Sequence, residues 1–537
     1  MSKGYLAIIL HAHLPFVKHE KDGELAEDWL YEAITETYIP LIIMMNRLWE
    51  KGAEFHFTLN ISPTLASMLA NPTLQYRYQK HLEKMIELSE KELIRTKNQP
   101  EFYKLAEMYN YLFKEAYYYF HEKYDNNLLS AYKEFQEKDL IEIITCAATH
   151  GYLPLMLTEE AMNAQVKIGV NTYQKFFDKR PEGIWLPECA FTPSLDPILA
   201  DNDIRYYISS SHGVLYAEPR PRYGLFAPIY TPSGLAAFGR DVESSKQVWS
   251  ANEGYPGDFN YREFYRDIGW DLDYDYLKDY LPSGIRKHTG LKYYKITGKS
   301  DWKDVYDPVL AREKAAEHAG NFMFNRQEQL KHLNELMDRK PIIVSPYDAE
   351  LYGHWWFEGP QWLEFLFEKI HFDQDVIETI TLSEYLKRHP KNQVAMPTES
   401  SWGYRGYHEV WLNDTNDWIY RHLHQAELKM IELAEQFDYL SSRSDIYYRT
   451  LNQMARELLL AQSSDWAFIM KADTMVDYAV LRTKRHLKNF STLEEQINRR
   501  NIIQEDLKRL ESVHDLFPEI DFKLYNKKEE VALRKEV

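Results

Sequence analysis

Short runs of apolar, β-branched and aromatic residues recur along the chain, and most are followed by polar residues and then by a helical pattern. They cover residues 5–10, 54–59, 141–146, 183–186, 205–209, 341–344 and 377–381. About seven strands that alternate with helices predict a parallel α/β barrel or a doubly wound sheet. Chemistry in such folds gathers at the carboxyl ends of the strands.

Three longer segments depart from this alternation. Residues 75–97 and 101–123 are amphipathic and charged, which predicts an inserted helical subdomain over 71–137. Residues 214–300 are rich in Gly, Pro and Tyr and predict a long functional loop region. From about residue 413 the pattern is helical, and Ser491-Thr-Leu-Glu494 has the form of a capping box that opens a helix. We therefore expect a catalytic barrel over 1–70 and 138–400, including 214–300, and a helical domain over 401–537 that contributes to the site.

The composition narrows the class of ligand. Forty Tyr, 13 Trp and an aromatic content of 15% fit either a Tyr-rich interior or a groove for sugar rings. A formal net charge of −18 disfavours nucleic acid and anionic membranes as partners, whereas a neutral polymer is compatible with it. No apolar run is long enough to span a bilayer. Two cysteines form no disulfide framework, which indicates a reducing cytoplasm.

One candidate catalytic carboxylate lies in the segment Gly183-Ile-Trp-Leu-Pro-Glu188-Cys-Ala. Glu188 follows a short apolar strand, and Pro187 restricts the turn before it. A Glu among Trp185, Leu186 and Cys189 is poorly solvated, so its burial needs a reason. Catalysis is one reason and a structural ion pair with an Arg is the other; we favour catalysis.

The second candidate lies in Ser345-Pro-Tyr-Asp348-Ala-Glu350-Leu-Tyr-Gly-His354-Trp-Trp-Phe-Glu358, directly after the strand at 341–344. Carboxylates beside aromatic residues suit glycosidic chemistry, in which one acid stays protonated and another stays ionised. Asp348 comes first after the strand and is the better acid. Glu350 and Glu358 are expected to form structural hydrogen bonds.

Histidines offer an alternative chemistry. His11 and His13 alternate along a strand end, and His150 and His212 follow other strands. These residues with Asp348 would suit a zinc site, although imidazoles also hydrogen-bond sugar hydroxyls. Phosphate-binding loops, dinucleotide fingerprints and nucleophile elbows are absent from the sequence, so nucleotide and cofactor chemistry lack support.

Several of these motifs resemble the signature regions of glycoside hydrolase family 57. They are HAHLP at 11–15, HGYLP at 150–154, WLPEC at 185–189, SPYDAELYGHWW at 345–356 and SSWG at 400–403. The resemblance runs over nearly the whole chain, and segments at 223–241, 261–270 and 463–468 are most similar to the 1,4-α-glucan branching enzymes of that family. It implies an incomplete (β/α)7 barrel with a helical insertion and a C-terminal helical domain. It also implies Glu188 as nucleophile, Asp348 as acid/base, and chemistry without a metal or cofactor.

The same resemblance implies substrate contacts at Arg266, Trp270, Trp402 and Asp465, with Arg262 as an alternative register for Arg266. We expect His11, His13 and His150 to line the donor subsite next to the cleaved bond. The Pro- and Gly-rich segment 223–241 predicts a projecting lid loop with Tyr230 at its tip.

The expected activity is α-glucan branching, with α-glucan chains as donor and acceptor. An α-amylase or a 4-α-glucanotransferase of the same family is the alternative. A metal-dependent hydrolase and an inactive glycan-binding protein are less favoured.

Overall fold

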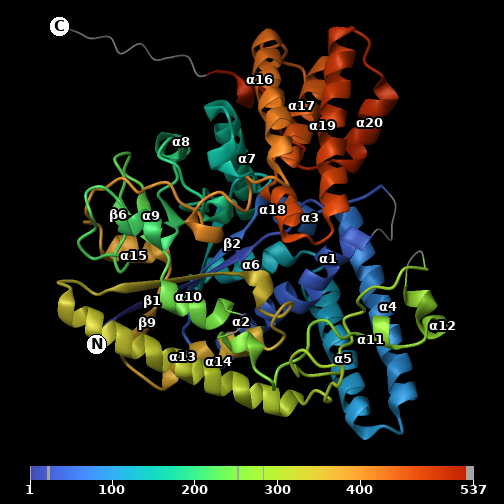
Figure 1. The fold of residues 1–537 in the computed structure, drawn as a ribbon, viewed down its shortest axis with the longest axis vertical. Coiled ribbons are helices and arrows are strands. Elements are labelled where there is room, and N and C mark those ends of the chain that lie inside the picture. Colours follow the sequence, from blue (N-terminus) through green and yellow to red (C-terminus); the bar gives the residue numbers. More distant parts are fainter. Residues whose placement is uncertain (1, 21–24, 251–252, 282–283, 528–537) are drawn as a thin grey trace.

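The computed structural model describes residues 2–20, 25–250, 253–281 and 284–527, and its centre is one curled sheet (Figure 1). The strands are β1 (Gly4–Ala12), β2 (Phe57–Ile61), β3 (Ile141–Cys146), β4 (Gly183–Trp185), β5 (Tyr206–Ser209), β6 (Ile229–Tyr230), β7 (Ala236–Gly239), β8 (Ile342–Asp348) and β9 (Ile377–Thr379). All seven predicted strands are present. The two that were not predicted, β6 and β7, lie in the segment that was expected to be a loop region.

The strand order is β6-β7-β5-β4-β3-β2-β1-β8, and β9 pairs with the start of β1. Every pairing is parallel except β6 with β7. The end of β7 approaches β8 through a hydrogen bond from the Asp241 amide to the Val344 carbonyl, at 2.8 Å. No strand pairing joins β7 to β8 among the described residues, so the barrel is curled but incomplete, as predicted.

Burial explains why the strands are read easily from the sequence. All nine residues of β1 are buried, because helices cover the outer face of the curled sheet and side chains of the other strands fill its inner face. Helices packed around the sheet include α1 (Leu25–Ala33), α2 (Ile39–Glu50), α3 (Pro63–Leu69), α7 (Glu159–Phe177), α8 (Leu195–Asp201), α9 (Ser211–Leu215), α10 (Val242–Trp249), α13 (Pro308–Leu336), α14 (Gly359–Phe372) and α15 (Leu382–Arg388). Short helices α11 (Ile268–Asp271) and α12 (Tyr274–Leu277) lie in the segment between β7 and α13.

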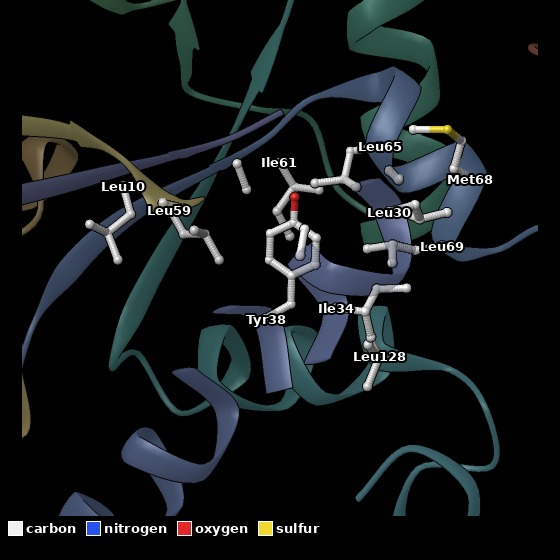
Figure 2. Packing of buried hydrophobic residues seen from close by; sticks show 14 of the residues in the cluster. Leu10, Leu30, Ile34, Tyr38, Leu59, Ile61, Leu65, Met68, Leu69 and Leu128 are labelled. Atoms are coloured by element: carbon white, nitrogen blue, oxygen red, sulfur yellow. The ribbon is translucent and has the colours of Figure 1, made fainter. Parts of the chain in front are cut away.

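Figure 2 shows how one part of the core is filled. Leu59 and Ile61 of the sheet face Ile34 and Tyr38, while Leu128 approaches from a later helix. Each buried Leu or Ile of this kind stabilises the fold by about 1.5–3 kcal/mol. Ile34 and Tyr38 bound a π-helical turn between α1 and α2.

The predicted helical insertion consists of α4 (Pro72–Thr96), α5 (Pro100–Tyr117) and α6 (Leu128–Glu137). Pro72 begins α4, and the Asn71 side chain accepts hydrogen bonds from the Thr73 and Leu74 amides, which fixes the helix start. In Figure 1, α4 and α5 extend side by side away from the sheet.

The C-terminal region consists of α16 (Tyr420–Gln436), α17 (Ile446–Ala461), α18 (Ser464–Ala472), α19 (Val476–Asn498) and α20 (Gln504–Val513). The capping-box prediction was wrong: Ser491 lies inside α19, where its hydroxyl donates to the Leu487 carbonyl. Such back-bonding lets a Ser continue a helix instead of starting one. None of the described helices is long and apolar enough to cross a membrane.

A buried polar cluster ties three parts of this region together. Glu457 of α17 accepts from His486 of α19 at 2.7 Å and from His514, just after α20, at 2.6 Å. Asn489 and Gln453 donate to the same carboxylate, which is fully buried. These partners lower the pKa of Glu457 despite its burial.

Candidate active site

A cavity of about 810 Å³ at the carboxyl ends of the strands collects most of the predicted residues. Its walls include His11, His13, His150, Glu188, Asp348, Trp402 and Asp465. Another cavity, of about 850 Å³ between α3, α7 and residues 515–524, contains none of them. The chemistry of the lining, rather than volume, therefore identifies the candidate site.

Glu188 follows β4 in a strained turn. Its φ is 62°, a left-handed conformation that costs a non-glycine residue about 1–3 kcal/mol, and His150 at the next strand end has φ 58°. Strain of this kind persists only where the surroundings impose it. At Glu188, residues from the C-terminal part of the chain make the contacts that hold the turn in this conformation.

Two backbone contacts dock that part onto the strand ends. The segment at 400–402 pairs with Glu188 and Phe191: the Trp402 amide donates to the Glu188 carbonyl at 3.0 Å, and Phe191 exchanges two bonds with Ser400. The Ser464 amide donates to the His150 carbonyl at 2.9 Å. Side chains from both segments thereby reach the carboxylate after β4.

The Glu188 carboxylate has two donors within reach. Trp402 Nε1 lies 2.8 Å from Oε2, and Ser464 Oγ lies 2.9 Å from Oε1. Burial raises the pKa of Glu188 to about 7, although these donors oppose the shift. The carboxylate is therefore ionised in a large share of molecules at neutral pH and is aimed into the cavity.

Asp348 ends β8 and lies beside His11 in the register of β1 with β8. Burial raises the pKa of Asp348 well above its ordinary value, and the negative charges of Glu350 and Glu188 add to the shift. No described side chain hydrogen-bonds the Asp348 carboxyl. The surroundings of Asp348 thus favour its protonated form, whereas the two donors at Glu188 favour its charged form.

Glu350 occupies the structural position expected of it. Its Oε1 accepts from the Tyr38 hydroxyl at 2.5 Å and from the His13 amide at 3.1 Å. Burial raises the pKa of Glu350 to about 7. Glu350 also lines the cavity, so its charge acts on Asp348 at short range.

The three predicted histidines form one connected group. His11 Nδ1 lies 2.6 Å from Asn60 Oδ1, its Nε2 lies 3.0 Å from His150 Nε2, and its ring stacks on Trp185 at 4.5 Å. Burial lowers the pKa of His11 and of His150 well below the usual value, and each is further lowered by neighbouring histidines. Both rings are therefore neutral.

Because both rings are neutral, each has one donor nitrogen and one acceptor nitrogen, which fixes the direction of the hydrogen bonds that run from Asn60 to Ser464. The Asn60 oxygen accepts from His11 Nδ1–H, so His11 Nε2 accepts from His150 Nε2–H. His150 Nδ1 then faces the Ser464 hydroxyl at 2.8 Å. The Ser464 hydroxyl has one proton, which it can donate either to His150 Nδ1 or to the Glu188 carboxylate. Ser464 therefore connects the carboxylate to the hydrogen-bonded histidines.

The His13 ring stacks on the His150 ring, with centroids 4.0 Å apart. Its Nδ1 contacts Ser62 Oγ at 2.8 Å and its Nε2 contacts Asp465 Oδ2 at 3.0 Å. Ligand atoms of His13, His150 and Asp465 all lie within 4.8 Å of one another, which is the nearest approach to a metal centre in the cavity. His13 and Asp465 bond each other, and both ring nitrogens of His150 already have hydrogen-bond partners in the protein.

His212, the fourth member of the zinc alternative, is not in this group. Its Nε2 contacts the Gly406 carbonyl at 2.8 Å, outside the cavity lining. The zinc site built from four histidines and Asp348 is therefore not formed as a unit.

Arg266 and Trp270 also lie outside the cavity lining. Arg266 pairs with Asp271 at 3.0 Å, and Trp270 is half exposed. Arg262, the alternative register, is buried with its guanidinium over Phe357 at 4.0 Å and 3.7 Å from Glu36. Neither arginine reaches the cavity.

The prediction of a lid loop at Tyr230 was wrong. Tyr230 lies in β6 and pairs with Ala236 at the start of β7, the end of the barrel opposite the cavity. Its amide donates to the Gln393 carbonyl and its carbonyl accepts from Ala395. Pro and Gly in this segment terminate a short hairpin and do not form a projecting loop. The cavity is instead bordered by Trp249, Ser250 and Pro256.

Sequence reasoning missed several contributors to the site. Ser464, which donates to Glu188, stands beside Asp465 in the segment 463–468 but was not predicted. Arg240 and Trp249, which line the cavity, had no local signal. Arg240 lies 5.7 Å from the Trp402 ring, and its charge opposes the rise in the pKa of Asp348.

Comparisons with known proteins agree with this geometry. A family model described as "Glycosyl hydrolase family 57" matches residues 7–398, and one described as "1,4-alpha-glucan branching enzyme, C-terminal" matches residues 422–525. The chain is 34% identical over 545 residues to the 1,4-alpha-glucan branching enzyme TK1436 of Thermococcus kodakarensis. That alignment covers 96% of this chain and 77% of that protein.

Two solved structures are similar over nearly their full length. The alpha-amylase AmyC from Thermotoga maritima superposes with a TM-score of 0.91 at 46% identity, covering 98% of this chain and 99% of that one. The GH57-type branching enzyme from Pyrococcus horikoshii gives 0.87 at 32% identity, covering 98% and 97%.

Proposed function

Because this chain belongs to glycosyl hydrolase family 57, we propose that it is a retaining 1,4-α-glucan branching enzyme with Glu188 as nucleophile and Asp348 as general acid and base. One observation carries the catalytic assignment. Two carboxyl groups share a cavity, and their surroundings separate their roles: Glu188 has donors that favour its charge, whereas Asp348 has neighbouring negative charges that favour its proton.

The first step cleaves an α-1,4 bond. Asp348 gives its proton to the glycosidic oxygen while a Glu188 oxygen attacks the anomeric carbon, so the reducing-end fragment leaves as an alcohol. A covalent glycosyl-enzyme remains on Glu188. Trp402 then loses its charged acceptor, and its bond to Oε2 weakens as the ester forms.

The second step transfers the bound chain. Asp348, now ionised, removes the proton from the 6-hydroxyl of an acceptor glucan, and that oxygen displaces Glu188 from the anomeric carbon. Two inversions give net retention and an α-1,6 branch. Water in place of the acceptor would give hydrolysis, so the ratio of the two activities depends on exclusion of water from the intermediate.

The remaining polar groups suit the donor sugar. His11, His13, His150 and Asp465 surround the carboxylate and offer hydrogen bonds to hydroxyls of the sugar next to the cleaved bond. Trp355 and Trp411 offer apolar walls to its ring faces. Arg266 and Trp270 would contact only a chain that extends beyond the cavity.

Branching is favoured over hydrolysis by the match of residues 422–525 to the C-terminal domain described for branching enzymes. The similarity to an α-amylase makes hydrolysis the second candidate. Incubation with amylose, followed by enzymatic debranching, separates them: new α-1,6 linkages in excess of new reducing ends support branching. Reducing ends without α-1,6 linkages would contradict it. Metal analysis of the same preparation tests the metal-dependent alternative.

Each of the three parts of the chain would have its own role in forming the active site. The barrel of 1–70 and 138–400 supplies Glu188 and Asp348, the helices of 71–137 buttress it, and residues from 401 onward complete the cavity. Cys146 and Cys189 are buried and unpaired, which supports a cytoplasmic location.

A further inference from the structure

A ribbon beside the cavity carries three highly exposed aromatic rings. Residues 259–265, 294–298 and 302–306, here called the aromatic ribbon, are joined by bridges between Arg262 and Lys295 and between Tyr294 and Val305. The exposed rings are Phe259 at 65%, Tyr265 at 72% and Trp302 at 75%. The three rings lie on the joined segments of one ribbon, and groups of large exposed apolar side chains mark binding sites.

The aromatic ribbon is continuous with the cavity at two points. Trp355 lines the cavity and stacks on Phe264 of the ribbon, with ring centroids 4.5 Å apart and planes 18° from parallel. Pro256 also lines the cavity, three residues before Phe259. A chain leaving the cavity over Trp355 therefore meets the ribbon next.

The ribbon is held in place from within. Lys303 Nζ donates to Glu263 at 2.8 Å and to the Gly298 carbonyl at 3.2 Å, which joins its two sides. Trp302 Nε1 donates to Asp304 at 3.1 Å, so the indole is anchored while most of its surface stays open. A ring fixed before binding loses little conformational entropy on binding.

The charges of the ribbon are largely paired, which suits a neutral ligand. Lys303 is neutralised by Glu263, and Lys295 lies 3.6 Å from Asp304. Aromatic faces without a free charge are what the apolar C–H faces of glucose units require. A nucleic acid or an anionic membrane would require unpaired cations.

We propose that the aromatic ribbon is a second binding surface for α-glucan, which holds a long chain as it leaves the cavity over Trp355. This inference rests on the proposed function, since it takes α-glucan as the substrate. It assigns Tyr265 and Trp302 a role in affinity for long chains and none in bond cleavage. Short oligosaccharides, which fit within the cavity, do not reach the ribbon.

The test measures binding without turnover. In a Glu188→Gln background, dissociation constants for amylose and for maltotriose are measured by calorimetry before and after Trp302→Ala and Tyr265→Ala. Each change is expected to weaken amylose binding about fivefold or more, the loss typical of an interface aromatic. Maltotriose binding should stay within about twofold. Trp302→Phe keeps an aromatic face and should keep most of the affinity.

Tyr439→Ala is the matched control, because Tyr439 is also 75% exposed but lies between α16 and α17. The ribbon role is overturned if Trp302→Ala and Tyr265→Ala behave like this control, or if maltotriose binding falls as much as amylose binding. Absence of amylose binding by the Glu188→Gln parent would overturn the proposed substrate as well. Binding by the parent that the ribbon variants leave unchanged would overturn the ribbon alone.

Discussion

Replacing Trp402 by Phe removes one of the two donors to Glu188 and keeps an aromatic ring in the cavity. The lost bond joins Nε1 to a carboxylate oxygen at 2.8 Å. A hydrogen bond to a charged group is worth about 1.5–3 kcal/mol, and one pKa unit corresponds to about 1.4 kcal/mol. With water entering in place of the indole, the lower end applies. The pKa of Glu188, now about 7, should rise by about one unit.

The assay is the pH dependence of kcat/KM for cleavage of short amylose, because kcat/KM reports the ionisation of the free enzyme. A higher pKa for the nucleophile leaves fewer ionised molecules at low pH. The ratio of variant to wild-type activity should therefore be about tenfold lower at pH 6 than at pH 9. Asp348 sets the alkaline limb of the pH profile in both proteins, so this limb does not appear in the ratio of their activities.

Trp411→Phe is the control, because Trp411 lines the same cavity and its buried Nε1 has no hydrogen-bond partner among the described residues. Its activity ratio should be independent of pH. A pH-independent loss in Trp402→Phe would show that the indole only shapes the cavity. A shift of the acid limb to lower pH would refute the electrostatic reasoning itself.

Other predictions concern charge, protonation and metal. Glu188→Gln should abolish turnover. Burial raises the folded-state pKa of Glu188 above that of the unfolded chain, so ionisation of Glu188 destabilises the fold progressively between about pH 4.5 and 7. In thermal denaturation, Glu188→Gln should therefore become more stable relative to wild type as the pH rises through that range. A stability difference that does not change with pH would contradict this. Asp348→Asn should suppress cleavage of amylose but leave activity on donors with an acidic leaving group, measured as release of an aryl alcohol; equal loss on both would argue against Asp348 as the acid. Glu457→Ala should lower the free energy of unfolding in urea by about 3–5 kcal/mol, because its buried donors lose their shared acceptor; a change below 1 kcal/mol would refute that role. Exhaustive chelation should leave activity intact, since His13 and Asp465 bond each other, whereas loss restored by zinc would revive the metal hypothesis.

The features that depend on local sequence patterns could be predicted from the sequence. Buried parallel strands are apolar runs, so all seven predicted strands were found. β6 and β7 were missed because the Pro and Gly residues around them were taken to indicate a loop. The structure places Glu188 and Asp348 in one cavity, as expected from their positions shortly after such runs, and their catalytic roles stay a prediction. Glu350 was correctly expected to form structural hydrogen bonds.

Long-range contacts were beyond local reasoning. Ser464 bonds Glu188 across 276 positions, and only the docking of α18 on the strand end brings the two together. Tyr230 failed for the opposite reason: Pro and Gly indicate a break in regular structure but not the end of the barrel at which it lies. The position of Arg266 could not be predicted either. Its ion pair with Asp271 is local in sequence, but its distance from the cavity depends on the folding of the whole chain.

The strained turn at Glu188 also sets an order of events during synthesis. Ribosomes deliver β4 early, but Trp402 and Ser464 emerge much later in a chain of 537 residues. Until then the turn at Glu188 has neither its backbone partner nor its two side-chain donors. A partly translated barrel therefore leaves Glu188 without these contacts, and the cavity is completed only after Ser464 has been made.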